Sequence, residues 1–239
     1  MRITWLEHCE STQDELAQAS KTVTAIASLN QSAGRGRHGR IWQSPQGAGL
    51  ALSWRAPVDD LAIEDLPLLS LASGLALHRS LSTKIIQQTT SPKPIEDLAL
   101  KWPNDLLFQK RKLAGILCEG KISSHGHSVL VGIGLNLVRH ADISVDYATL
   151  DELGLKFKSS SQINHLCQSL INELDSTLNE LKSSKSSVLE EWQKRSLALG
   201  TDIKAAGQQG IYRGIDQKGA LLLDIGDQLI SVESGEVHL

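Results

Sequence analysis

Residues 98–120 read LALKWPNDLLFQKRKLAGILCEG and contain three short apolar runs separated by polar residues. The runs cover Leu98–Trp102, Leu106–Phe108 and Leu113–Glu119, and a fourth follows at Val129–Leu137. Residues such as Gln109-Lys110-Arg111 supply the turn chemistry between them. Because the links between consecutive runs are short, they favour antiparallel pairing. This part of the chain therefore predicts a largely antiparallel sheet.

Capping signals and periodicity predict the elements around these runs. A short helix is expected to begin at Ser11 and Thr12, each of which is followed three residues later by an acidic residue. Apolar residues at helical spacing predict helices at 68–81, 163–181 and 188–197, with a break at Ser183–Ser187. Strands are expected at 22–29 and 50–54, and an exposed loop at Thr89–Pro94. The helices should cover one face of the sheet.

The texture of the sequence changes after Gly200. Short apolar runs at 203–205, 210–215, 220–224, 229–232 and 236–239 alternate with glycines. This pattern predicts a small all-β barrel. The chain is therefore expected to be an α+β protein with two units, residues 1–195 and 196–239.

Composition indicates an ordinary globular protein. Hydrophobic residues make up 41% of the 239 residues, charged residues 21%, and the net charge is -3. The acidic balance argues against binding to nucleic acid through phosphate contacts. Three scattered cysteines, Cys9, Cys118 and Cys167, favour neither a disulfide framework nor a zinc site. Neither a signal peptide nor a membrane span is recognisable, so a cytoplasmic location is expected.

The most distinctive motif is the loop Gly-Arg-Gly-Arg-His-Gly-Arg-Ile-Trp at Gly34–Trp42. Its glycines allow backbone amides to approach an anion, and its arginines supply forked positive charge. This combination suits a phosphate, although neither a Walker loop nor a dinucleotide fingerprint is present. A solvated basic loop or a nonspecific RNA contact would have the same composition.

Three further motifs carry groups with chemical potential. Lys101 and Asp105 flank a Trp-Pro turn, where they could hold an anion and Mg²⁺, although a plain β-turn has the same signature. Lys112 enters an apolar strand, and Gly115 three residues later marks either a close approach of a ligand or a bulge. Asn136 ends the run Gly-Ile-Gly-Leu-Asn and suits an adenine edge, a turn or a cap.

Taken together and in this order, the motifs resemble those of the biotin protein ligase family. GRGRxGRxW together with KWPND is highly specific, and the resemblance extends from Ser11 to the C-terminal stretch Gly219–Leu223. It implies a class II synthetase-like catalytic domain, with a mixed, mostly antiparallel sheet flanked by helices, and an SH3-like β-barrel. The implied reaction forms biotinyl-5′-AMP from biotin and ATP and transfers biotin to a lysine of a biotin carboxyl carrier protein.

The resemblance also implies roles for individual residues. Arg37, Lys101 and Lys112 would be catalytic, and Asp105 would hold Mg²⁺. Biotin would contact Ser11, Thr12, Gln31, Arg35, Gly36, Arg37, Lys112 and Gly115. ATP or the adenylate would contact Gly34, Arg35, Arg37, Arg40, Trp42 and Asn136. Gln13 departs from the asparagine that many members carry at this position.

The resemblance also implies partners, and two alternative functions stay open. Only ten residues precede Ser11, so the form without a DNA-binding domain is expected, with no specific DNA binding and no membrane association. The carrier is expected to add a strand to an exposed sheet edge, and the same edge could support a homodimer. One alternative is a lipoate or octanoate ligase on the same scaffold. The other is a noncatalytic protein that binds biotin or nucleic acid.

Overall fold

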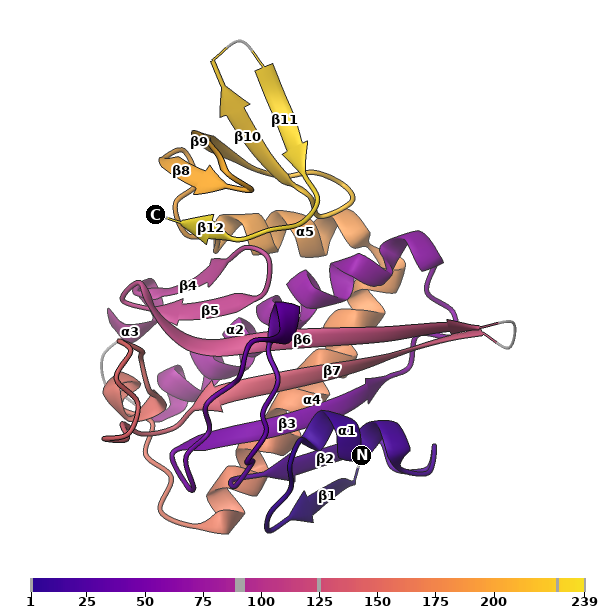
Figure 1. Cartoon of the computed structure of the whole chain (residues 1–239), viewed down its shortest axis with the longest axis vertical. Coiled ribbons are helices and arrows are strands. Elements are labelled where there is room, and N and C mark those ends of the chain that lie inside the picture. The colour runs from indigo at the N-terminus through magenta and orange to yellow at the C-terminus, as the bar shows by residue number, and fades with distance from the viewer. Residues whose placement is uncertain (1, 89–92, 124–125, 227, 239) are drawn as a thin grey trace.

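A seven-stranded sheet forms the centre of the molecule (Figure 1). The structure is a computed structural model that describes residues 2–88, 93–123, 126–226 and 228–238. The strand order is β1-β2-β3-β7-β6-β5-β4. Only β1 and β2 pair in parallel, so the sheet is mixed and mostly antiparallel, as predicted. The strands are β1 Ile3–Leu6, β2 Ala25–Ser28, β3 Gly49–Ala56, β4 Leu98–Lys101, β5 Asp105–Phe108, β6 Arg111–Ser123 and β7 Gly126–Asn136.

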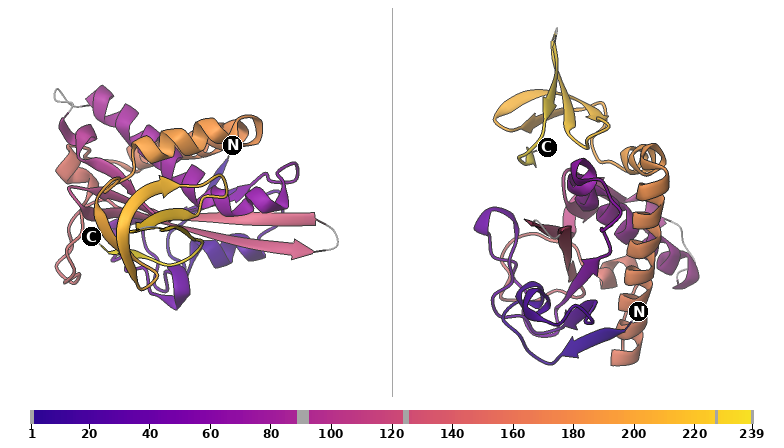
Figure 2. Two further views of the ribbon diagram at one scale, coloured as in Figure 1. Left: turned by 90° about the horizontal axis from the view of Figure 1, so that it is seen from above. Right: turned by 90° about the vertical axis from the view of Figure 1, so that its right-hand side faces the viewer.

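The long helices α2 and α4 pack against each other and cover one face of this sheet (Figure 2). Alternate residues of β7, such as Val131, point into the core between these helices and the sheet. The short helix α1 packs on β2, β3 and β7, near the glycines of β7. The helices are α1 Thr12–Gln18, α2 Leu69–Gln88, α3 Lys93–Glu96, α4 Ser160–Ser183 and α5 Lys185–Lys194, with 3-10 turns η1 Arg37–Gly39, η2 Ile63–Leu68 and η3 Leu150–Leu153.

A second, five-stranded antiparallel sheet lies beyond α5 in the chain and has the order β11-β10-β9-β8-β12. Its outer strands, β11 and β12, do not pair with each other among the described residues. The sheet is therefore open, and the closed barrel expected from the sequence is not confirmed. The strands are β8 Asp202–Ala205, β9 Gln208–Ile215, β10 Leu221–Ile225, β11 Gln228–Val232 and β12 Val237–His238.

The two sheets share one continuous hydrophobic core. The Trp102 indole Nε1 donates a hydrogen bond to the carbonyl oxygen of Gly219, 2.9 Å away in the turn before β10. The Leu197 backbone N–H donates to the Leu100 carbonyl oxygen at 2.7 Å, which attaches the connection after α5 to the edge strand β4. These two hydrogen bonds attach the C-terminal sheet next to the KWPND motif.

Several predicted boundaries were wrong by a few residues. The strand expected at 22–29 covers only Ala25–Ser28, because Thr22 lies in a turn where its side chain bonds to Ser20. The predicted break at Ser183–Ser187 narrows to Ser184, since α5 begins at Lys185 and ends at Lys194. The loop expected at Thr89–Pro94 lies largely outside the described residues, and Lys93–Glu96 is helical. The edge strand β1 was missed because it is short and half-exposed.

Candidate functional site

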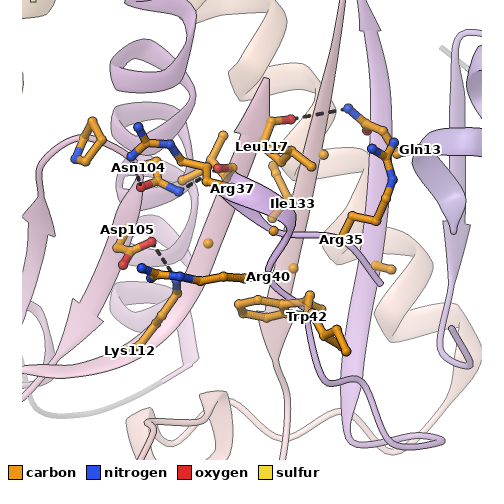
Figure 3. Close-up of a pocket in the computed structure, with 18 of the residues that line it drawn as sticks. Gln13, Arg35, Arg37, Arg40, Trp42, Asn104, Asp105, Lys112, Leu117 and Ile133 are labelled. Carbon is orange, nitrogen blue, oxygen red and sulfur yellow. Dashed lines mark hydrogen bonds and ion pairs between the residues drawn. The ribbon is translucent and has the colours of Figure 1, made fainter. Parts of the chain in front are cut away.

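A cavity of about 290 Å³ opens on the α1 side of the sheet, where the Arg/Gly loop (Gly34–Trp42) crosses β6 and β7 (Figure 3). Almost every residue that the sequence placed in a binding or catalytic role lines it. These are Ser11, Thr12, Gln31, Arg35, Gly36, Arg37, Arg40, Trp42, Lys101, Asp105, Lys112 and Gly115. Residues from five separate stretches of sequence, 11–12, 31, 35–42, 101–105 and 112–115, are therefore brought to one site.

Uncharged polar side chains form one end of the cavity. The Thr12 backbone N–H donates to Gln31 Oε1 at 2.9 Å, and the Thr12 and Ser53 hydroxyls lie 2.9 Å apart. Ser11 caps α1 through its hydroxyl, which accepts from the Asp14 backbone N–H. All of these side chains are buried, with Ser53 only 1% exposed. This end suits a small ligand group that both donates and accepts hydrogen bonds.

The middle of the cavity is narrow and apolar because glycines replace side chains on the sheet. The Trp42 indole lies against Gly115 and Gly134, so that a Cβ at Gly115 would stand 3.1 Å from the ring. A Cβ at Gly134 would overlap the indole outright. The Lys112 ammonium lies 5.5 Å from the centroid of the same ring. The indole therefore packs directly on the strand backbone at these two glycines, which narrows the middle of the cavity.

Charged side chains form the other end, on the left of Figure 3. Lys112 Nζ lies 2.8 Å from Asp105 Oδ1, and Arg37 Nη1 donates to Asn104 Oδ1 at 3.3 Å. Lys101 also lines this end. Because β5 and β6 pair in antiparallel register, the KWPND turn and Lys112 are brought side by side. Several cations facing one space attract anions and offset repulsion between them.

The C-terminal sheet contributes to the same end, which the sequence did not predict. Arg40 of the loop pairs with Glu236, and Arg37 Nη1 also donates to the Gly235 carbonyl oxygen at 3.3 Å. Glu236 and Val237 line the cavity. Proximity to Arg40 holds the pKa of the Glu236 carboxyl below its usual range. No motif in the sequence pointed to these residues, because the contact depends on how the second sheet docks.

Arg35 lines the cavity and is also held by carboxylates at its rim. Its guanidinium donates to both carboxylate oxygens of Glu119 and to Asp14, at 2.7 Å in each case. The hydrogen bonds with Glu119 raise the pKa of Arg35. Arg35 thus joins the loop to β6 and α1 along the rim of the cavity.

Two predicted contacts, Gly34 and Asn136, do not line the cavity. A Cβ at Gly34 would collide with Gln31 and with the Trp42 backbone, so glycine is needed for the loop to cross there. Asn136 is 8% exposed, and its Nδ2 donates to the Lys112 carbonyl oxygen at 3.1 Å. In this structure Asn136 supports the start of β6, the strand that carries Lys112. Ser53, which does line the cavity, was missed because a single polar residue carries no motif. Gln13, whose role the sequence left open, lines the cavity as well.

The donor set for a metal ion is small. No group of three or more His, Cys, Asp or Glu side chains within residues 2–88, 93–123, 126–226 and 228–238 could hold a metal. Asp105 offers one largely buried carboxylate in the cavity, with the Asn104 amide beside it. Mg²⁺ is commonly held by one or two carboxylates together with substrate phosphates and water. The site therefore fits Mg²⁺ only if an anionic substrate supplies further oxygens.

Comparison with known proteins identifies the family. The model of the Biotin/lipoate A/B protein ligase family matches residues 4–136. A biotin--[acetyl-CoA-carboxylase] ligase of Mycobacterium tuberculosis is 34% identical over 217 residues, covering 88% of this chain and 77% of the relative. The chain belongs to this family. The chain is also 34% identical to the bifunctional ligase/repressor BirA of Escherichia coli, over 92% of this chain and 67% of BirA.

Solved structures of family members agree with the fold. A biotin protein ligase from Aquifex aeolicus in complex with biotin and ATP has a TM-score of 0.77 and 27% identity. The superposition covers 99% of this chain and 97% of the Aquifex chain. The architecture described above thus matches that of the Aquifex chain over nearly the full length of both chains. Within the described residues, no helix is long and apolar enough to cross a membrane.

Proposed function

We propose that the protein is a biotin protein ligase that forms biotinyl-5′-AMP from biotin and ATP and transfers biotin to a carrier lysine. The supporting observation is the order of environments along the cavity: neutral polar, narrow apolar, then cationic. Biotin has a matching order, with a ureido head, a thin bicyclic and aliphatic body, and a carboxylate. The Mycobacterium relative is named a biotin--[acetyl-CoA-carboxylase] ligase, and the Escherichia coli relative a bifunctional ligase/repressor.

In this proposal each end of the cavity has a separate task. Ser11, Thr12 and Gln31 bind the ureido head, and Trp42 and Gly115 enclose the body of biotin. The biotin carboxylate then lies beside Lys112. ATP occupies the cationic end, where Arg37, Arg40 and Lys101 contact its phosphates. Gly34 and Gly36 give the loop the backbone freedom to fold over them, and Asn136 contacts adenine once the loop has moved.

The first chemical step is attack of a biotin carboxylate oxygen on the α-phosphorus of ATP. The bond to the bridging oxygen of pyrophosphate breaks, and pyrophosphate leaves. Both reactants are anions, so the main task of the protein is to align them and offset their repulsion. Lys112, Lys101 and Arg37 are the cations placed to do this. Mg²⁺ held by Asp105 and phosphate oxygens would supply further positive charge.

The second step is attack of a neutral lysine amine of the carrier on the acyl carbon of the adenylate. An amide bond forms, AMP leaves, and the amine loses one proton. The mixed anhydride is already activated, so no covalent enzyme nucleophile is required.

We further propose that the carrier is a biotin carboxyl carrier protein and that it adds a strand to a free edge of a sheet. In the large sheet the outer strands are β1 and β4. The connection after α5 already bonds to β4 at Leu100, so β1 is the edge proposed for the carrier. A homodimer through a sheet edge remains part of the proposal. The division into a catalytic unit, residues 1–195, and an SH3-like C-terminal unit, residues 196–239, is proposed on the same basis.

One assay tests the function. The protein is incubated with ATP, Mg²⁺, biotin and a biotin carboxyl carrier domain, and mass spectrometry locates biotin on the carrier. We expect one biotinyl-lysine in the presence of ATP and none in its absence. Lipoate and octanoate, tested in parallel for exchange of pyrophosphate into ATP, should support little exchange. Preference for either acid over biotin would show that the protein is a lipoate or octanoate ligase instead.

The variant Lys112→Ala links the assay to the cavity. Its side chain is 40% exposed, so its loss should change the free energy of unfolding little. Biotin-dependent pyrophosphate exchange should fall by at least about 100-fold, by analogy with the loss of other charge-stabilising groups. Normal pyrophosphate exchange by this variant would show that Lys112 takes no part in the reaction.

A further inference from the structure

A β-bulge at the start of β6 decides which way Lys112 points. The pairing of β5 with β6 skips Leu113, which is the extra residue of the bulge. In a regular strand, residues three apart face opposite sides of the sheet. Because of the bulge, Lys112 and Gly115 both line the cavity, and the Lys112 side chain points toward Asp105 (Figure 3). The direction of the lysine is therefore set by the backbone around the bulge.

A segment outside the sheet holds the backbone of Lys112. The pairing of β6 with β7 begins only at Ala114. The Lys112 carbonyl oxygen instead accepts hydrogen bonds from the Ala148 backbone N–H at 2.9 Å and from Asn136 Nδ2 at 3.1 Å. Lys112 also forms an isolated parallel bridge with Tyr147. The position of Lys112 thus depends on where Tyr147 and Ala148 lie.

An ion pair fixes this segment to the residue next to Lys112. Arg111 Nη1 donates to the Tyr147 carbonyl oxygen at 3.1 Å and to Glu152 Oε1 at 3.3 Å, and Arg111 Nη2 donates to Glu152 Oε2. The Thr149 hydroxyl also donates to Glu152 Oε1, at 3.1 Å. An arginine that makes two hydrogen bonds to one carboxylate is held in one orientation. Glu152, which lies in η3, therefore fixes Arg111 and the chain after Tyr147 to each other.

This ion pair is partly buried and lies outside the cavity. The Arg111 and Glu152 side chains are 22% and 27% exposed. The hydrogen bonds from Arg111 hold the pKa of the Glu152 carboxyl below its usual range, and Arg139 Nε is a second cation 3.4 Å from this carboxylate. Neither Arg111 nor Glu152 is among the described residues that line the cavity. Any effect of Glu152 on the reaction must therefore pass through the residues that it holds.

We infer that Glu152 is a positioning residue that keeps the Lys112 ammonium facing the cavity. It acts through Arg111 and through the backbone of residues 147–148. This inference rests on the proposed function and adds a residue to the machinery of its first step. A displacement of about 1 Å in a group that aligns reactants can slow a reaction by about 100-fold. Loosening the ion pair leaves both hydrogen bonds to the Lys112 carbonyl oxygen in place, so we expect a smaller loss.

The test compares Glu152→Gln with Asp224→Asn, a matched change that neutralises a carboxylate of similar exposure, 25%, in an ion pair of the C-terminal sheet. Glutamine keeps an oxygen for the Thr149 hydroxyl but loses the charge that orients Arg111. We expect kcat for biotin-dependent pyrophosphate exchange to fall about tenfold in Glu152→Gln, while the KM for ATP stays within about twofold of wild type. Asp224→Asn should behave as wild type in both measurements.

A double-mutant cycle separates positioning of the lysine from a general effect on the fold. In a Lys112→Ala background the ammonium that Glu152 positions is gone, so adding Glu152→Gln should change the remaining exchange by less than about twofold. A loss of about tenfold that persists in this background would overturn the inference, because two residues that act through one group are not additive. Wild-type kcat in Glu152→Gln would overturn it as well.

A second variant and a spectroscopic measurement serve if Glu152→Gln does not fold. Arg111→Lys keeps the positive charge without the fork of two hydrogen bonds, and it should lower kcat about two- to fivefold, again only when Lys112 is present. In protein labelled with ¹³C-lysine, the Lys112 ¹³Cε resonance should move in Arg111→Lys and stay in place in Asp224→Asn. An unmoved Lys112 resonance in Arg111→Lys would overturn the inference. Absence of biotin-dependent exchange in the wild-type protein would instead refute the proposed function.

Discussion

His78 is a buried histidine outside the cavity, and it makes the stability of the protein sensitive to pH. Its ring lies between the Leu98 carbonyl oxygen, 3.2 Å from Nε2, and the Ser82 hydroxyl, 3.3 Å from Nδ1. Burial, reinforced by the nearby charge of Arg195, lowers the pKa of His78 to about 4 from the ordinary 6.5. The folded protein therefore keeps this imidazole neutral at pH 5.

Between about pH 6.5 and pH 4 the unfolded chain binds a proton that the folded protein does not bind, so stability falls as the pH falls. We expect the free energy of unfolding to decrease by about 2 kcal/mol from pH 7 to pH 5 through His78 alone. Urea titrations at the two pH values measure this decrease. His78→Gln keeps a donor for the Leu98 carbonyl and should show a correspondingly smaller decrease; an identical decrease would assign it to other groups.

Those residues of the site that stand in recognisable motifs were predictable from the sequence. Arg37, Lys101 and Lys112 stand in motifs whose chemistry is recognisable in one dimension, and all three line the cavity. Ser53 was not predictable, because its place in the cavity comes from burial and from the pairing of the strands. Glu236 was not predictable either, because its partner Arg40 lies almost two hundred residues away.

At the scale of elements, Arg79 connects three helices. From α2, its guanidinium donates to Glu191 of α5 and, at 2.8 Å, to Glu180 of α4, with the Thr177 hydroxyl at 3.3 Å. We expect Arg79→Met to lower the free energy of unfolding by about 2 kcal/mol, because the partly buried Glu180 loses its ion pair and Glu191 keeps only its pair with Arg195. Chemical denaturation measures the change. Arg213→Met breaks an exposed pair with Asp224 and should cost less than about 1 kcal/mol.

The Arg/Gly loop is an element whose position depends on ion pairs at its base. Glu119→Gln weakens the attachment of Arg35 to β6, so the loop should close less firmly over the adenylate. Both partners are well exposed, and such pairs contribute about 1 kcal/mol or less. Release of labelled biotinyl-5′-AMP should therefore accelerate about two- to fivefold. A lower melting temperature with unchanged release would show that the pair stabilises the fold and not the closed loop.

Elements were predictable wherever the pattern was local. The four apolar runs between Leu98 and Leu137 became strands in the expected antiparallel order, because short links leave little choice of neighbour. The parallel pairing of β1 with β2 was not predictable, since it joins segments separated by α1. The open C-terminal sheet differs from the expected barrel because closure requires pairing between β11 and β12, which no local signal specifies.

At the scale of the whole molecule, Trp102 links the cavity to the second sheet. Trp102→Phe removes the hydrogen bond to the Gly219 carbonyl oxygen and leaves that acceptor without its partner, while the ring volume is largely kept. We expect faster hydrogen exchange in β8–β12 and a several-fold higher KM for ATP, since Glu236 and Val237 line the cationic end. The KM for biotin should change little. Equal increases in both KM values would indicate damage to the whole cavity.

The difference in exposure between the two ends of the cavity also predicts the order in which the substrates bind. Its neutral polar end is closed, with Thr12 and Ser53 at most 3% exposed, whereas the Arg40 side chain at the other end is 64% exposed. A nucleotide resting at the exposed end would obstruct the route to the closed one. Turnover should therefore be compulsory-ordered, with the acid loading first, and an ATP analogue should inhibit uncompetitively towards biotin. Mixed inhibition would indicate a second entrance.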